Sequence, residues 1–207
     1  GAAAMGLGIW SMHFVAMLAF HLPIPVGYDL AITLYSLAAS VGASAYALWL
    51  VSHAELPWSR LIAGAVLMGL GIACMHYLGM AAMRMQPGIV YDPLWFAASL
   101  LIAIVAAGAA LWIAFRLRTE QRRPALLRGL ASLVMGLAIV GMHYTGMAAA
   151  TFPEGSICGA ANTGGLDTKW LAVLVIVTTL GTLGIALIAS LFDRQMRART
   201  GLLADSL

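Results

Sequence analysis

The stretch CMHYLGMAA at residues 74–82 returns as GMHYTGMAA at residues 141–149, and these two copies organise the whole chain. A third version, SMHFVAMLA at residues 11–19, carries Phe where the others carry Tyr and Ala where they carry Gly. Each version places one histidine inside a long apolar segment, where a polar side chain is costly and commonly functional. Three histidines in one repeated setting need a common explanation.

The surrounding chain has 207 residues, of which 62% are hydrophobic and 9% are charged, far from the usage of globular proteins. A helix needs about 20 apolar residues to cross the bilayer core. Six segments, nearly free of charge, are long enough: 1–21, 29–52, 61–83, 94–115, 129–152 and 170–192. Because lipid offers the backbone no hydrogen-bond partner, each segment is predicted to be an α-helix. The predicted fold is an all-α, polytopic membrane helical bundle with six spans.

Basic residues gather in alternate connections of this bundle. One set of connections and the tail carry most of them: Arg60, Arg116, Arg118, Arg122, Arg123, Arg128, Arg194, Arg197 and Arg199. The other connections carry only Arg84 and Lys169. The positive-inside rule places the first set and the C-terminus in the cytoplasm. The net charge of +3 follows from this bias, so no nucleic-acid partner is predicted.

The repeat extends beyond the histidines. A shift of 63 residues brings His13 onto His76 and Tyr28 onto Tyr91, and a further shift of 67 brings His76 onto His143. The first, third and fifth predicted spans are therefore equivalent, and we call them the motif helices. The second, fourth and sixth spans follow them as partner helices. All three motif helices run in the same direction, and we expect their histidines at one depth, roughly 12–15 Å below the outer helix ends.

On a helical wheel, each histidine shares its face with a glycine seven residues before it, a small residue three after it and a methionine four after it, within about 60°. These faces consist of Gly6, His13, Ala16 and Met17; Gly69, His76, Gly79 and Met80; and Gly136, His143, Gly146 and Met147. Small residues permit close approach of membrane helices. If the faces converge, three imidazoles and three thioethers meet.

Imidazole combined with thioether favours copper, because soft sulfur suits Cu(I) and imidazole accepts both copper oxidation states. Mg²⁺ or Ca²⁺ would need carboxylates, which the spans lack. The candidate metal ligands are His13, His76, His143, Met17, Met80 and Met147, with Met12, Met75 and Met142 at the flank of each face. A copper ion with incomplete coordination in an apolar pocket would accept O₂, NO or CO, or report redox state.

Other readings stay open for the whole chain: a haem-binding redox protein, a copper carrier or channel, a purely structural bundle, or a site for a lipid headgroup or hydrophobic ligand. Tyr77 and Tyr144 are predicted to pack rather than to ligate. Asp29, Asp92 and Asp167 are predicted to cap the partner helices, with an acidic mouth for metal ions as the alternative. Cys74 points away from the histidine face, Cys158 lies in a loop, and no disulfide is predicted.

With three copies of Met-His-[Phe/Tyr]-x-[Gly/Ala]-Met on alternate membrane helices, the chain resembles the MHYT domain, a bacterial integral-membrane sensor module. The resemblance implies a copper site formed by the motif Met and His residues near the outer face, and sensing of oxygen, carbon monoxide or nitric oxide. It also implies a place in the bacterial inner membrane. Such domains are often joined to cytoplasmic GGDEF and EAL domains, which make or degrade cyclic di-GMP.

Two features depart from the family pattern. That pattern has seven helices, with a partner helix before the first motif helix, so we expect a missing N-terminal segment and an uncovered flank on the first helix. The first motif has Phe14 and Ala16 where the others have Tyr and Gly. A role that requires the tyrosine hydroxyl therefore cannot be threefold.

The tail after residue 192 is rich in helix formers and basic residues. We expect residues 1–192 to form the membrane-embedded sensor domain and residues 193–207 to begin a cytoplasmic signalling helix, with a basic membrane-surface anchor as the alternative. No catalytic motif is present, so the chain is predicted not to be an enzyme. The predicted partners are the lipid bilayer, a diatomic gas, GGDEF and EAL domains in the same protein, and a second copy in a homodimer.

Overall fold

The computed structural model describes residues 1–53, 55–117 and 124–204. Within these ranges, six helices are long and apolar enough to cross a membrane, as predicted. They are α1 (Ala2–Ala19), α2 (Leu30–Ser52), α3 (Trp58–Ala81), α4 (Pro93–Leu117), α5 (Pro124–Ala149) and α7 (Thr168–Ala204). Arg118, Arg122 and Arg123 and the last residues of the tail, 205–207, lie outside the described residues. The chain is a multi-pass, all-α membrane protein.

The partner helices begin where the aspartates predicted them to begin. The Asp29 carboxylate accepts a hydrogen bond from the backbone N–H of Ile32 at 3.1 Å, and the Asp167 carboxylate accepts one from Trp170 at 2.8 Å. The Asp92 carboxylate accepts from two N–H groups of α4, at 2.9 and 3.0 Å. Pro93 then occupies the first helical position, where its missing N–H costs nothing. The predicted capping role is confirmed.

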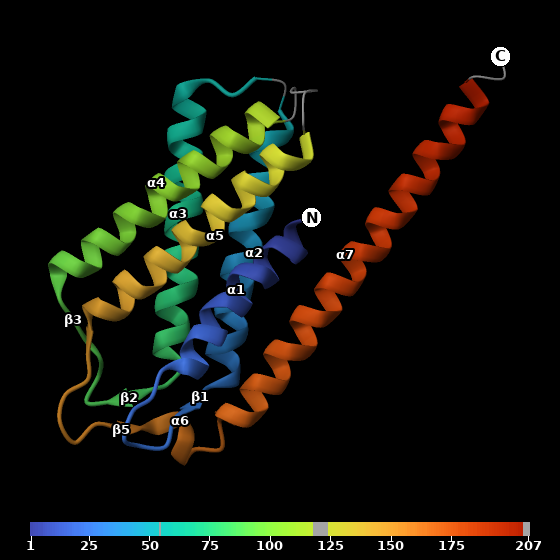
Figure 1. The fold of residues 1–207 in the computed structure, drawn as a ribbon. Helices are drawn as coiled ribbons and strands as arrows, with labels where there is room; N and C mark the ends of the chain where they lie inside the picture. The colour runs from blue at the N-terminus through green and yellow to red at the C-terminus, as the bar shows by residue number, and fades with distance from the viewer. Residues whose placement is uncertain (54, 118–123, 205–207) are drawn as a thin grey trace.

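Each of the first two partner helices lies between two motif helices (Figure 1): α2 packs against α1 and α3, and α4 packs against α3 and α5. Glycines make this packing close. A Cβ atom added to Gly6 would lie 2.6 Å from Cα of Val41, and one added to Gly69 would lie 2.6 Å from Cα of Ile104. The same backbone-to-backbone contact therefore occurs in two repeats, and it uses the glycine seven residues before each histidine.

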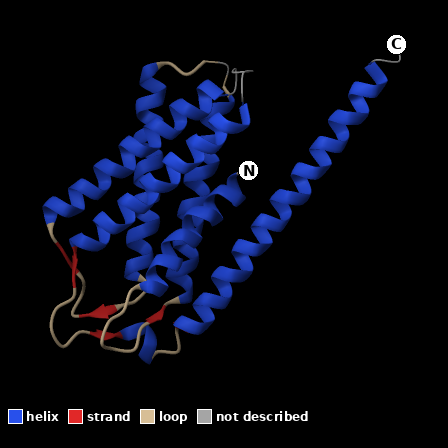
Figure 2. Cartoon of the chain, in the orientation of Figure 1, coloured by secondary structure: helices blue, strands red, loops and turns tan. Residues whose placement is uncertain are grey.

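Short strands close one end of the bundle, which we call the strand end (Figure 2). The pairs, all antiparallel, are β1 (Gly27–Tyr28) with β6 (Leu166–Asp167), β2 (Met85–Gln86) with β5 (Ile157–Cys158), and β3 (Val90–Tyr91) with β4 (Ala150–Thr151); the four-residue helix α6 (Gly159–Asn162) lies beside them. Both cysteines are free, as predicted. Cys158 is buried, and its thiol lies 3.0 Å from the Met83 carbonyl and 3.3 Å from the Gly27 carbonyl.

The third repeat departs from this symmetry. The helix α7 packs against α1 near its start, where Leu171 and Val175 are buried, and then diverges from the other helices (Figure 1). Gly136, the equivalent of Gly6 and Gly69, would give a Cβ atom no neighbour within 4 Å. Among the described helices, the close glycine contact of the first two repeats is therefore absent at Gly136 of α5.

Candidate metal centre

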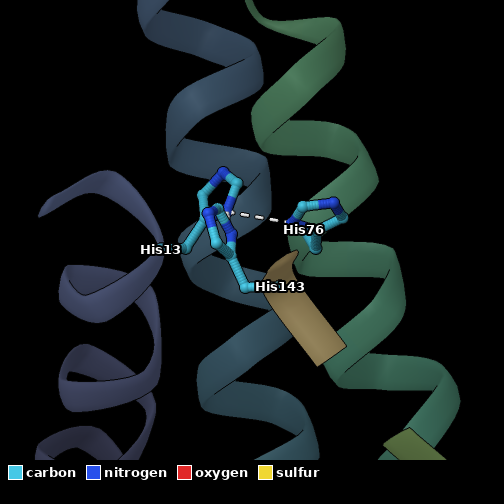
Figure 3. A group of neighbouring side chains, drawn as sticks. All are labelled: His13, His76 and His143. Carbon is cyan, nitrogen blue, oxygen red and sulfur yellow. Dashed lines mark hydrogen bonds between the residues drawn. The ribbon is translucent and has the colours of Figure 1, made fainter. Parts of the chain in front are cut away.

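The three motif histidines lie together in the centre of the bundle. His13 on α1, His76 on α3 and His143 on α5 are 0%, 1% and 2% exposed. Figure 3 shows their rings turned toward one another, and one ligand atom from each lies within 4.8 Å of the others. The motif helices end five or six residues after each histidine. The centre is therefore about 8–9 Å below the helix ends, shallower than predicted, because the last residues of each apolar segment leave the helix for the strand end.

The inward-facing atoms are the Nδ1 nitrogens. His13 Nδ1 lies 3.1 Å from His143 Nδ1 and 3.1 Å from His76 Nδ1. The rings meet edge to face, with centroids 4.9 to 5.1 Å apart and interplanar angles of 72° to 89°. The three imidazoles thus aim one nitrogen each at a shared point.

Hydrogen bonds among the three rings cannot satisfy all three Nδ1 atoms. Each ring nitrogen carries either one proton or one lone pair, in a single in-plane direction. His13 Nδ1 faces two other nitrogens at the same distance, so one proton can be shared well with only one of them. A cation at the shared point would instead accept a lone pair from all three nitrogens.

The spacing fits a metal ion after a small adjustment. Bonds of about 2.0–2.1 Å from imidazole nitrogen to a metal, in tetrahedral or trigonal geometry, set the nitrogens about 3.3–3.6 Å apart. The two Nδ1 separations from His13, both 3.1 Å, need to lengthen by only a few tenths of an ångström, and the ligand atoms of all three histidines lie within 4.8 Å of one another. The cluster is also the one group of three His, Cys, Asp or Glu side chains within the described ranges that is spaced to hold a metal.

Glycines enclose two of the three rings. A Cβ atom on Gly79 would collide with His13 Nε2, and one on Gly146 would lie 2.6 Å from His76 Nε2. Both Nε2 atoms are buried and have no hydrogen-bond partner among the described residues. In the second and third repeats, the glycine three residues after the histidine therefore makes room for the histidine of the preceding repeat. The helical wheel placed these glycines on the histidine face, but it could not show that each glycine contacts the histidine ring of another helix.

The third ring, that of His143, borders a cavity instead of a glycine. Ala16, the counterpart of Gly79 and Gly146, lines a cavity of about 400 Å³ together with His143, Met147 and Phe152. This cavity lies between α1 and α5, on a side of the bundle that none of the described partner helices covers. One edge of the centre therefore borders a cavity, whereas the other two pack against glycines.

The motif methionines differ in burial. Met17, Met75, Met80 and Met142 are at most 2% exposed and belong to the hydrophobic core around the centre. Met147 is partly buried beside His143, and Met12 lines a separate cavity of about 280 Å³ with Met5 and Met135. Metal ligation by all six stays a prediction.

The motif aromatic residues surround the rings. Tyr77 packs edge-on against His76, and its hydroxyl lies 2.7 Å from the Ser99 hydroxyl, whereas Tyr144 is 60% exposed. Phe14 contacts His13 on one side and Tyr28 of the strand end on the other. Burial raises the pKa of Tyr28 above its ordinary value, so its phenol stays neutral. Cys74 is exposed, away from the centre, as the wheel predicted.

A haem group does not fit between these rings. Two axial histidines must stand on opposite faces of a flat macrocycle. Here every pair of rings is in direct contact, with centroids at most 5.1 Å apart. The geometry therefore favours a single ion over a haem.

Comparison with known proteins supports a signalling role. The family model MHYT, described as a bacterial signalling protein N-terminal repeat, matches residues 6–64, 69–127 and 136–201. Each match begins within a motif helix and includes the partner helix that follows it. No solved structure matches the chain.

Three curated relatives are larger signalling proteins. The bifunctional diguanylate cyclase/cyclic di-GMP phosphodiesterase MucR of Pseudomonas aeruginosa is 68% identical over all 207 residues. The cyclic di-GMP phosphodiesterase NbdA of the same species is 47% identical over 72% of the chain, and the signaling protein YkoW of Bacillus subtilis is 44% identical over 73%. The chain spans 30% of the length of MucR and 19% of each of the others.

Proposed function

Because the chain belongs to the MHYT family of bacterial signalling domains, we propose that it is a membrane sensor whose three histidines hold a copper ion. The motif methionines complete the donor set, and Met147 lines the same cavity as His143. The sensed quantity is a diatomic gas, O₂, NO or CO, or the redox state of the surroundings. The output is a cyclic di-GMP enzyme domain elsewhere in the same protein.

One observation carries the proposal: the buried His13 Nδ1 lies 3.1 Å from both His76 Nδ1 and His143 Nδ1, without a proton arrangement that satisfies both contacts. The spans supply sulfur beside imidazole and no carboxylate near the cluster, which favours copper over hard cations. When bound, copper would supply a redox-active centre with affinity for small diatomic ligands. The residues of the chain hold this centre in a region that excludes water, since all three rings are at most 2% exposed.

The route of the signal follows from the packing. His13 belongs to α1, and α1 is the helix against which α7 packs. The helix α7 continues without a break from the predicted span to Ala204. A ligand that favours one arrangement of the histidines would therefore shift α1 and bias α7, by no more than its difference in affinity for the two arrangements. The names of MucR and NbdA support cyclic di-GMP metabolism as the output.

The orientation remains part of the proposal. The basic residues favour the C-terminus in the cytoplasm and the strand end outside the inner membrane. On this orientation residues 1–192 form the sensor domain, and residues from 193 onward lead the signal to the output domain.

The experiment is metal analysis with an optical spectrum on purified protein in detergent. Copper close to stoichiometric in the wild type should be lost in a His13→Ala, His76→Ala, His143→Ala variant that remains folded. The matched control is His21→Ala with His53→Ala, which removes two histidines outside the cluster and should keep the metal. If the wild-type protein binds no metal when copper is supplied in excess, the histidines have a structural role only. If the protein instead moves copper into liposomes, it is a copper carrier.

A further inference from the structure

The three edges of the histidine cluster differ in what lies behind them. The edge at His13 is closed by Gly79 and the edge at His76 by Gly146. The edge at His143 borders the cavity of about 400 Å³ between α1 and α5. Its rim residue Ala19 is exposed, whereas the equivalent residues Ala82 and Ala149 are fully buried.

This cavity adjoins a second one at the strand end. The second cavity measures about 340 Å³ and is lined by Leu22, Phe152, Met85 and Glu154, among others. Leu22 and Phe152 also line the first cavity, so the two share a wall. Phe20 packs against Phe152 there, with ring centroids 5.4 Å apart. The two cavities therefore lie side by side between the loops of the strand end and His143, with the rings of Phe20 and Phe152 where they adjoin.

The donors along this line are ordered for a soft cation. Glu154 is exposed at the loop and offers a carboxylate, which attracts cations from water. Met85 lines the same cavity, Met147 lines the next one, and His143 stands at its inner wall. Thioether and imidazole are ligands that a soft ion such as Cu(I) accepts after losing its water. A cation moving inward would thus exchange oxygen for sulfur and sulfur for nitrogen.

We infer that the two cavities form the access route by which a soft metal cation reaches the histidine cluster from the strand end, with Glu154 at its mouth and His143 at its inner end. This inference rests on the proposed metal centre. It makes the three repeats unequal in function, because only the third histidine meets the incoming ion. Phe20 and Phe152 form the narrow point that the ion must pass.

A first test needs no metal. Diethyl pyrocarbonate, which acylates accessible imidazole nitrogen, is added to the full-length protein in membrane vesicles, and each histidine is followed by mass spectrometry. His143 should react faster than His13 and His76 by about tenfold or more, because the other two are reached only through local opening of the helices. Ala19→Phe, which fills the rim, should slow His143. Val15→Phe, on an exposed position of α1 that does not line the cavity, should not.

A second test measures loading with Cu(I). Stopped-flow or chelator-competition kinetics should show slower loading of Ala19→Phe by about tenfold, with the final metal content unchanged, because the route is narrowed and the ligands are intact. Glu154→Gln should slow loading at low ionic strength and lose this effect in high salt.

The outcomes separate the two proposals. A wild type that binds no copper overturns the proposed metal centre, while the acylation order still tests the route. Equal acylation of the three histidines, or an Ala19→Phe variant that leaves both the His143 rate and the loading rate unchanged, overturns the route.

Discussion

The edges of the cluster at His13 and His76 and the edge at His143 are built from the same motif, yet they end in different surroundings. At the first two, a glycine of the next repeat lies against the ring and a partner helix covers the outside. At the third, Ala16 and His143 face a cavity. A repeated sequence can thus supply three matching histidines while the helices around them place only the third beside this cavity.

The largest expected effect comes from closing the space for a ring. Gly79→Ala places a Cβ atom on His13 Nε2, so His13 must turn away from the cluster. We expect copper affinity to fall by about 10- to 100-fold, the usual cost of misdirecting a metal ligand. Competition with a calibrated Cu(I) chelator measures it. Ala16→Gly, at the edge beside the cavity, should leave copper affinity unchanged. A Gly79→Ala variant with full copper affinity would show that Gly79 does not enclose the His13 ring.

The next effect concerns the outer shell of helices. Gly69→Ala forces a Cβ atom to within 2.6 Å of the Ile104 backbone, so α3 and α4 must separate. We expect a loss of about 1–3 kcal/mol in the free energy of unfolding. Gly136→Ala, at the equivalent position facing open space, should not destabilise the protein, because alanine is the better helix former. Thermal unfolding in detergent compares the stability of the two variants. An equal loss of stability would mean that another helix packs against α5 at Gly136.

A smaller difference is expected between the two motif tyrosines. Tyr77→Phe removes the hydroxyl that bonds to Ser99 at 2.7 Å, and the stability should fall by about 0.5–1.5 kcal/mol. Tyr144→Phe removes a hydroxyl from a side chain that is 60% exposed and should change stability little. Chemical unfolding of the pair tests this. An equal effect at Tyr144 would show that its hydroxyl has a partner in the membrane.

The smallest effect is expected at the strand end. The N–H groups of Asp29 and Asp92 donate to the carbonyls of Ala82 and Ala149, at 2.7 and 2.8 Å. The equivalent carbonyl of Ala19 faces the exposed His21 ring at 2.9 Å. His21→Ala should cost less than about 0.5 kcal/mol, because water replaces the ring at an exposed site. The free energy of unfolding is measured for both proteins. A loss larger than this would show that the His21 ring replaces the backbone hydrogen bond made in the other two repeats.

Much of the fold follows from local chemistry that the sequence displays. The spans follow from apolar length, and the starts of α2, α4 and α7 follow from Asp29, Asp92 and Asp167. The meeting of the three histidines was predictable in outline, because a shared repeat on parallel helices places them on equivalent faces at one depth.

Other features depend on contacts between distant residues. The strand pairs join segments with two residues each, too short for a period-2 pattern to be seen. The burial of Cys158 depends on carbonyls at Gly27 and Met83, which lie in other loops. The divergence of α7 leaves Gly136 open although its sequence setting matches that of Gly69. These outcomes are set by tertiary packing rather than by local propensity.

The most direct test of the account is X-ray absorption at the copper edge on the copper-loaded protein. We predict nitrogen neighbours at the distance of about 2.0 Å typical of metal–imidazole bonds, with the outer scattering pattern of imidazole rings, and a weaker pattern in His13→Ala, which keeps two of the three rings. A first shell of sulfur or oxygen alone, without imidazole scattering, would contradict the histidine centre.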